Sequence, residues 1–392
     1  MRNTLFLLAL CQALGMTVSS MLVSSSGLIG ESLSPDPKWA TLPVSMQFFF
    51  TMLATLPASM LMQRKGRRFG FMLGAVIMML GACITAYAIY VQSFIGFILG
   101  LMVLGSAIAF FQLFRFAAID VAPPEYTSKA VSWVLLGGLI AAFTGPNLAS
   151  YTHLINVEHP FLITFLSAVP LALLMMVLLS RMNLPAPSAV EISGQQRPVK
   201  EIIKQPVFIV AVVSAMIAYG VMTFLMTATP LAMKGHGFDF GQTAFIIQWH
   251  IVGMFAPSFF TGAIIQRIGV LTVMLLGAVA YVGVVMLNFQ PQTMLVYWLA
   301  LVLLGIGWNF MFIGATTLLH DAWRPAEKGK VQGINDTLVF SAATVAAMSS
   351  GILYANMGWE SMNLFTLPLT AIAASLIIYL MMTRKRSSPL VV

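Results

Sequence analysis

The chain alternates between long apolar stretches and short polar ones over its whole length. Twelve apolar stretches are each long enough to form the helix of about 20 residues that crosses a bilayer. They cover residues 4–30, 40–62, 69–90, 93–119, 128–150, 160–180, 206–232, 242–266, 270–288, 292–319, 329–354 and 361–383. None has the regular polar and apolar alternation of a transmembrane β-strand. The pattern therefore predicts an all-α membrane protein with twelve transmembrane helices.

The longest polar stretch, residues 181–205, divides these apolar stretches into two sets of six. It reads RMNLPAPSAVEISGQQRPVKEIIKQ and has no apolar periodicity. Its Pro, Ser, Gln and charged residues are typical of a linker. We therefore expect one six-helix bundle over residues 1–180, a cytoplasmic linker over 181–205 and a second bundle over 206–392.

The two sets of six carry matching residues in their loops. SMLMQRKG at 59–66 is matched by GAIIQRIG at 262–269, with a shift of 203 between the two Gln-Arg-x-Gly motifs. The Asp, Pro and Lys at 120, 124 and 129 recur at 321, 325 and 330, with a shift of 201. Internal repeats of this size are typical of secondary transporters, which bind their substrate between the repeats.

Composition and charge agree with a membrane protein. Only 8% of the residues are charged and 59% are hydrophobic, whereas a soluble domain carries about 25% charged residues. With a cytoplasmic N-terminus, 17 of the 20 Lys and Arg lie on the cytoplasmic side, as the positive-inside rule requires. This placement explains the net charge of +8 without a nucleic-acid partner. It predicts a multi-pass protein of the bacterial inner membrane, with both termini in the cytoplasm.

In these twelve stretches, the linker and the repeated loops, the chain resembles the major facilitator superfamily over essentially its whole length. The family's loop between spans two and three reads G-x-x-x-D-R-x-G-R-R. It aligns here with Ser59, Gln63, Arg64, Gly66, Arg67 and Arg68, so the basic residues are kept while the first Gly and the Asp are replaced. The resemblance implies two pseudo-symmetric six-helix bundles, transport by alternating access and a monomer in the lipid bilayer.

A second motif bears on the direction of transport. LLGGLIAAFTGPNLA at 135–149 resembles the Gly-Pro motif of the drug:proton antiporter branch, carried here by Gly137, Gly138, Gly145 and Pro146. The resemblance implies proton-driven efflux. Small residues also let any two helices pack closely, so packing alone is a second interpretation. The Arg that such antiporters carry early in span four aligns with Gly100 and is absent.

Charged residues gather at the cytoplasmic ends of several predicted helices. In the family, acidic and basic groups at these ends link neighbouring helices when the cytoplasmic side is closed. The candidate residues for such a cytoplasmic gate are Arg64, Arg68, Arg115, Asp120, Arg267 and Asp321. For Arg115, snorkelling of the long side chain to the headgroups is an equally open interpretation.

Neutral polar and aromatic residues inside the apolar stretches predict a substrate pocket. The candidates are Gln12, Gln47, Phe111, Gln112, Asn147, Tyr219, Gln248, Trp308 and Asn309. Pockets with apolar walls and a few polar groups suit organic ligands. The alternative is that the amides bridge helices and the aromatic rings face lipid.

Two titratable residues inside predicted spans are candidates for proton coupling. An ionisable group within the membrane is a functional hypothesis by default, which favours Asp336. His250 can change charge near neutral pH. The alternatives are that Asp336 is a gate anion near the cytoplasmic edge and that His250 is a hydrogen-bonded packing residue.

The sequence carries no signal for catalysis. It lacks the P-loop motif and Gly-x-Ser-x-Gly, and its Cys and His residues form no metal-ligand pattern, so we expect neither an enzyme nor a cofactor. The main prediction is proton-coupled efflux of a small, neutral or weakly charged, partly aromatic solute. The alternative is import of a small organic nutrient such as a flavin-like vitamin. A non-transporting sensor is a distant third, because the loops are too short to hold a soluble domain.

The charge distribution makes the topology testable. A reporter that fluoresces only in the cytoplasm, fused after Val392, should be bright, because the basic loops keep both termini inside. A dark fusion that is nevertheless stably expressed would reject this topology.

Overall fold

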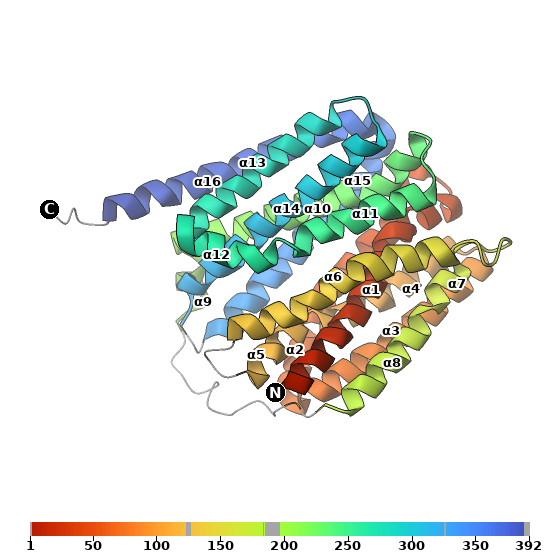
Figure 1. Cartoon of the computed structure of the whole chain (residues 1–392), viewed down its shortest axis with the longest axis horizontal. Helices are drawn as coiled ribbons and strands as arrows, with labels where there is room; N and C mark the ends of the chain where they lie inside the picture. Colours follow the sequence, from red (N-terminus) through yellow and green to blue (C-terminus); the bar gives the residue numbers. More distant parts are fainter. Residues whose placement is uncertain (1, 123–126, 183, 185–196, 325–326, 388–392) are drawn as a thin grey trace.

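The computed structural model describes residues 2–122, 127–182, 184, 197–324 and 327–387, and helices dominate these ranges (Figure 1). The first half contains α1 (Arg2–Leu33), α2 (Leu42–Lys65), α3 (Arg67–Tyr90), α4 (Phe94–Phe111), α5 (Phe114–Val121), α6 (Thr127–Thr152), α7 (Leu162–Leu166) and α8 (Ala168–Ser180). The second half contains α10 (Pro206–Gly235), α11 (Phe240–Phe255), α12 (Ser258–Ile268), α13 (Val270–Asn288), α14 (Met294–Leu319), α15 (Lys328–Leu364) and α16 (Thr366–Ser387). Short helices η1 (Pro37–Trp39), α9 (Val199–Ile203) and η4 (His320–Ala322) lie between them.

The predicted twelve-helix fold is confirmed. Within the described ranges, 10 stretches are long and apolar enough to cross a membrane, and the last of them, Gly333–Arg384, contains both α15 and α16. The helix α6 completes the set of twelve. Because lipid offers no hydrogen-bond partner to a backbone group, each span satisfies its own N–H and C=O groups as a helix.

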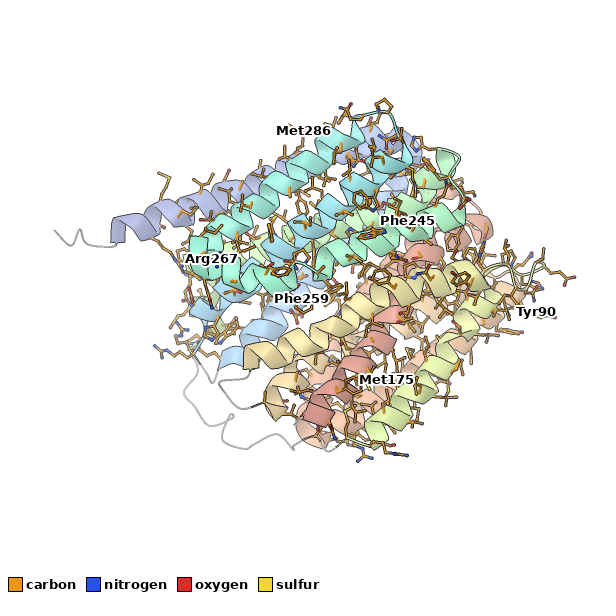
Figure 2. The ribbon with its side chains drawn as sticks, in the orientation of Figure 1. Tyr90, Met175, Phe245, Phe259, Arg267 and Met286 are labelled. Atoms are coloured by element: carbon orange, nitrogen blue, oxygen red, sulfur yellow. The ribbon has the colours of Figure 1, made fainter. Side chains whose placement is uncertain are left out.

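The first turn of α1, the end of α8 and the end of α16 lie towards one end of the molecule, which we call the inner end, and the opposite end is the outer end (Figure 1). Arg267 marks the inner end and Tyr90 marks the outer end in Figure 2. Side chains such as Val279 and Met286 project from the bundle surface and are more than half exposed. In a membrane these side chains face lipid.

The repeated loop motif corresponds to a repeated backbone turn. Gly66 joins α2 to α3 with φ +90°, and Gly269 joins α12 to α13 with φ +86°. Each glycine also donates its N–H to the carbonyl four residues earlier, on Met62 and Ile265 respectively. A positive φ favours glycine over residues with a side chain. The matched glycines thus reflect a shared turn in the two halves.

Buried apolar side chains form separate clusters in the two halves. One cluster runs from Leu5 to Met182 and includes a stacked pair of rings, Phe71 and Phe114, with centroids 4.0 Å apart. The other two clusters draw on residues 202–380, with Ala142 as the one fully buried member from the first half. Each half therefore packs mainly against itself, as expected for bodies that move relative to one another.

Three spans that the apolar pattern presents as continuous are broken. The fourth breaks at Gln112 between α4 and α5, the sixth at Ser167 between α7 and α8, and the eighth at Pro257 between α11 and α12. Proline has no N–H, so it interrupts the helical hydrogen-bond ladder. Conversely, α15 continues ten residues beyond its predicted end at 354, with a kink where Gly358 has φ +75°.

The end of the linker is fixed to the second half by a buried ion pair. Glu327 is fully buried and accepts hydrogen bonds from the backbone N–H and the guanidinium of Arg197 and from the backbone N–H of Arg324. The shortest contact, from Arg197 Nη2 to Glu327 Oε2, is 2.6 Å. These bonds hold the pKa of Glu327 well below its ordinary range, with the Arg197 side chain as the largest cause. This contact and the short helix α9 were not expected from the polar composition of the linker.

Removing the Glu327 charge should destabilise this attachment. Glu327→Gln should lower the unfolding temperature at pH 7, because it leaves Arg197 without its carboxylate. A carboxylate with a depressed pKa stabilises the fold above the ordinary Glu pKa of about 4.3 and loses this effect as pH falls through the folded-state pKa. The difference between wild type and variant should therefore be constant above about pH 5 and shrink in stronger acid.

Thermal unfolding in detergent across this pH range is the measurement. Glu201→Gln is the matched control, since Glu201 is an exposed carboxylate on α9 near the same arginine. Equal unfolding temperatures for Glu327→Gln and the control would contradict a stabilising role.

Candidate functional site

A central cavity of about 360 Å³ lies between the two halves. Its lining comes from α1, α2, α4 and α6 in the first half and from α10, α11, α12, α14 and α15 in the second. Thr317, two residues from the inner end of α14, is part of the lining. The cavity therefore extends from the middle of the bundle towards the inner end.

Most of the predicted pocket residues line this cavity. The predicted residues in its lining are Gln12, Gln47, Phe111, Gln112, Tyr219 and Trp308, together with the coupling candidates His250 and Asp336. These residues lie on seven different spans, so the fold brings together what the sequence spreads over more than 300 positions.

The other three predicted pocket residues bond to protein groups beside the cavity. Asn147 on α6 donates to the side-chain oxygen of Gln248 on α11 at 2.8 Å, which joins the two halves. Asn309 is fully buried and donates to the Met254 carbonyl and the Ser258 hydroxyl. The Asn309 amide thus satisfies a backbone carbonyl near the break between α11 and α12. This is the helix-bridging role that we gave as the alternative to a role in the pocket.

Several residues that line the cavity have a buried polar atom with no hydrogen-bond partner among the described residues. These atoms are Gln12 Oε1, Ser20 Oγ, Gln47 Oε1, Thr223 Oγ1, His250 Nε2 and Trp308 Nε1. Buried polar groups are normally satisfied, and leaving one unpaired costs about 1–3 kcal/mol. A cluster of unpaired atoms around one cavity is the expected signature of a binding site for a polar organic molecule.

Aromatic rings line the second-half side of the same cavity. Trp308 and Phe312 are stacked with centroids 4.9 Å apart and an interplanar angle of 17°. Tyr219 meets both rings edge-on at 5.8 and 5.4 Å, and Phe340 at 5.5 Å. We call these four residues the aromatic wall. Such a wall favours stacked or edge-on contacts with a planar ligand.

Sequence reasoning missed the small hydroxyl residues of the site and two of the four aromatic residues. Ser and Thr inside a helix commonly bond the carbonyl four residues earlier, as Thr17 and Ser24 do here at 2.7 and 2.9 Å. Ser20 and Thr223 look the same in the sequence but lack such a bond. Only the packing of neighbouring helices distinguishes the two kinds.

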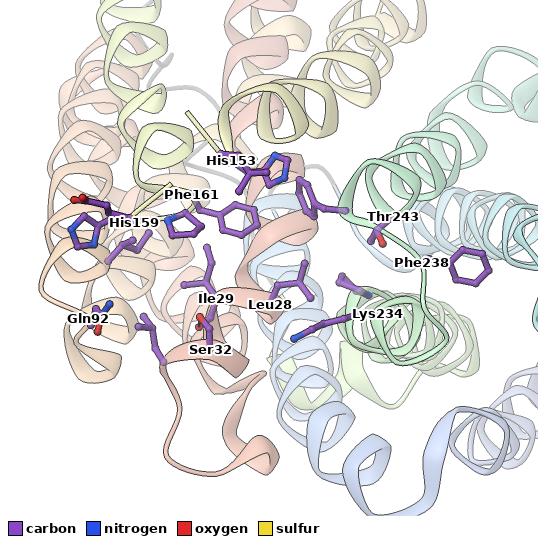
Figure 3. A pocket seen from close by; sticks show the side chains of 17 residues that line it. Leu28, Ile29, Ser32, Gln92, His153, His159, Phe161, Lys234, Phe238 and Thr243 are labelled. Atoms are coloured by element: carbon purple, nitrogen blue, oxygen red, sulfur yellow. Dashed lines mark hydrogen bonds between the residues drawn. The ribbon is translucent and has the colours of Figure 1, made fainter. Parts of the chain in front are cut away.

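Contacts between the halves gather towards the outer end. Lys234 on α10 binds Glu31 on α1 at 2.6 Å, and the Gly351 N–H donates to the Thr41 hydroxyl at 3.1 Å. Figure 3 shows Lys234 pointing towards α1 beside an outer cavity of about 700 Å³. With the central cavity extending towards the inner end, these contacts describe an arrangement that is closed at the outer end.

The ion pairs described at the inner end do not join the two halves. Asp120 binds Arg67 at 2.9 Å, while Arg68 donates to the Ser180 carbonyl at 3.0 Å. In the second half, Asp321 binds Arg384 at 2.9 Å, and Arg267 is exposed. The side chains of Arg64 and Arg115 lie outside the described part of the chain. The gate remains a prediction for these residues, with Arg67 as a partner that we did not anticipate.

The Gly-Pro motif on α6 lies against α1. A Cβ on Gly137 would come within 2.5 Å of the Ala9 carbonyl oxygen, and one on Gly145 within 2.7 Å of the Thr17 carbonyl oxygen. A Cβ on Gly138 would press on Phe255 and Met16. Close helix packing is therefore sufficient to explain these three glycines, whatever the direction of transport.

Comparison with known proteins gives the family. The model of the Major Facilitator Superfamily matches residues 5–347. The riboflavin transporter RfnT of Brucella anthropi is 40% identical over 375 residues, which cover 95% of this chain and 94% of the relative. The uncharacterized MFS-type transporter YdeG of Bacillus subtilis is 27% identical and covers 93% of this chain and 88% of its own.

Solved structures of low sequence identity share the fold. A D-xylose-proton symporter superposes with a TM-score of 0.75 at 14% identity, over 95% of this chain and 96% of its own. The xylose transporter XylE of E. coli, in a partially occluded inward open conformation, gives a TM-score of 0.74 at 12% identity, over 96% and 97% of the two chains.

The ion pair at the outer end should help to keep that end closed. Glu31→Lys would bring two cations together and should speed the labelling, by an impermeant thiol reagent added from outside, of a cysteine placed at Thr227 in a Cys83→Ser background. Exposed ion pairs contribute about 1 kcal/mol or less, so the expected increase is at most about fivefold. The charge swap Glu31→Lys with Lys234→Glu should return labelling to the original rate. An unchanged rate in the single variant would assign the closure to apolar contacts instead.

Proposed function

Because the chain belongs to the major facilitator superfamily, we propose that it is a secondary transporter that imports riboflavin or a closely related flavin. The observation that carries this proposal is the 40% identity, over almost the full length of both chains, with a protein named as a riboflavin transporter. The flavin-like nutrient that stood as our alternative thus becomes the preferred substrate.

The chemistry of the central cavity supports this substrate. Riboflavin is neutral and combines a planar tricyclic ring, an imide edge and an arm of hydroxyl groups. The aromatic wall offers surfaces to the ring, and the unpaired atoms of residues such as Gln47 and Ser20 offer partners to the polar groups. Among the described lining residues, Asp336 is the one Asp, Glu, Lys or Arg, so nothing described there favours a strongly anionic ligand.

Import is the better supported direction. The argument for drug efflux was the Gly-Pro motif, and the contacts of Gly137 and Gly145 with the α1 backbone account for its glycines by packing. The Arg that the antiporter branch carries in span four is replaced by Gly100, which packs tightly against Thr85. Neither feature leaves a specific reason to prefer export.

The remaining parts of the proposal follow from the charge pattern and the cavity. We place the protein in the bacterial inner membrane as a monomer, with both termini in the cytoplasm, because the basic residues gather at the inner end. Proton coupling is proposed, with Asp336 and His250 as candidates, since both line the cavity and can exchange a proton. No catalytic step is part of this function.

Flavin uptake into proteoliposomes tests the proposal. Wild-type protein should show saturable uptake of riboflavin, followed by flavin fluorescence, with faster uptake when the outside is more acidic. Trp308→Leu should reduce uptake at low substrate by about two- to tenfold, because an aromatic contact is worth about 0.5–1.5 kcal/mol. Trp249→Leu is the matched control, since Trp249 packs against Trp298 rather than in the cavity lining.

Three outcomes separate the alternatives. Absence of riboflavin uptake by well-folded protein would reject the substrate. Uptake without any response to a pH gradient would leave facilitated import and remove the proton. Uphill accumulation of drug-like cations driven by an acidic interior would instead support the efflux interpretation.

A further inference from the structure

The internal repeat relates two cavity residues whose side chains are chemically different. Gln47 on α2 and His250 on α11 are separated by the same shift of 203 that relates Gly66 to Gly269. Both line the central cavity, one from each half. The shift therefore makes them equivalent positions in the two bundles.

The packing around the two residues is equivalent as well. Gly105 on α4 lies so close to the Gln47 backbone that a Cβ would collide with the Gln47 carbonyl oxygen. Gly305 on α14 is placed in the same way against the carbonyl oxygen of His250. In each half, a glycine lets a neighbouring span approach the backbone of a polar residue that lines the cavity.

Each of the two side chains has one buried polar atom without a described partner. Gln47 is 4% exposed and its Oε1 accepts no hydrogen bond, while His250 is 1% exposed and its Nε2 has no partner. The other ring nitrogen of His250, Nδ1, lies 2.8 Å from the Leu301 carbonyl oxygen. A carbonyl can only accept, so Nδ1 carries the hydrogen and Nε2 of the neutral ring is an acceptor. The site thus presents one acceptor from each half.

Resting on the flavin function proposed above, we propose that Gln47 and His250 are a pseudo-symmetric pair of substrate anchors. His250 Nε2 accepts the imide N–H of the ring, and the Gln47 amide binds the hydroxyl groups of the arm. The aromatic wall decides which anchor binds the ring of the ligand. His250 is on α11, and Phe255 of the same helix contacts the Trp308 ring, with centroids 6.0 Å apart. All four rings of the aromatic wall belong to the second half, and the first half adds unpaired polar atoms on Gln12 and Ser20 that suit a polyol.

Two anchors on opposite halves make the ligand a bridge between them. A molecule that keeps only the ring or only the arm reaches one anchor, whereas a flavin reaches both. The pair therefore makes binding specific for ligands that carry a hydrogen-bond donor at each end.

The test pairs each anchor with a ligand that lacks its partner group. Affinities of the purified full-length protein in detergent are measured by quenching of flavin fluorescence, for riboflavin, N3-methylriboflavin and lumiflavin. N3-methylriboflavin lacks the imide hydrogen, and lumiflavin lacks the hydroxyl arm. Wild-type protein should bind each analogue roughly tenfold more weakly than riboflavin, as expected for loss of one buried hydrogen bond.

Each variant should abolish the preference for riboflavin over one of the two analogues. In His250→Leu, N3-methylriboflavin should bind as well as riboflavin while lumiflavin remains weaker, and in Gln47→Met the reverse should hold. His250→Gln keeps an acceptor and should restore the discrimination against N3-methylation. If His250→Leu does not fold, as judged by thermal unfolding and gel filtration, His250→Phe replaces it with a ring of similar volume.

The outcomes distinguish this assignment from the function on which it rests. If wild-type protein binds riboflavin but both variants keep the wild-type ratios for the two analogues, the anchor pair is wrong and the flavin function stands. If the two losses are exchanged between the variants, the ligand is held in the opposite orientation and the assignment of the ends is overturned. If wild-type protein does not bind riboflavin, both the proposed substrate and the assignment of the anchors are rejected.

Discussion

The absence of hydrogen-bond partners in lipid is the constraint on which the rest of this structure depends. It forces each span to be helical, and it makes a polar side chain inside the bundle either a partner for another protein group or a partner for a ligand. Asn309 illustrates the first outcome, since it satisfies the Met254 carbonyl beside a break in the eighth span. Gln47 and Trp308 illustrate the second, because both residues line the cavity and each has a buried polar atom with no described partner.

Much of the fold could be predicted from the sequence because apolar length and loop chemistry are local properties. The twelve spans, the linker and the matched glycines at Gly66 and Gly269 are all visible in the order of residues. The break at Gln112 could not be predicted, because no proline lies at that point to mark it.

The site was harder to predict, because its members depend on contacts between distant helices. Gln12, Gln47 and Trp308 could be identified as unusual polar or aromatic residues in apolar runs, and they line the cavity. Asn147 and Gln248 have the same local signature but bond each other. Ser20 and Thr223 carry no signal at all, since their neighbours bond within their own helix. Which amide remains available to a ligand is decided by tertiary packing alone.

The attachment of Arg197 to Glu327 has a consequence for the freedom of the two halves. It makes the last part of the linker travel with the second half, so the length of chain that tethers the halves runs only from Met182 to Arg197. At about 3.3–3.6 Å per residue, this segment can span about 50 Å when it is fully extended. Tilting of two helical bundles around a central cavity requires a much shorter distance than this. The linker therefore connects the halves without limiting how far they move. The range of motion is then set by the surfaces that meet when each end closes.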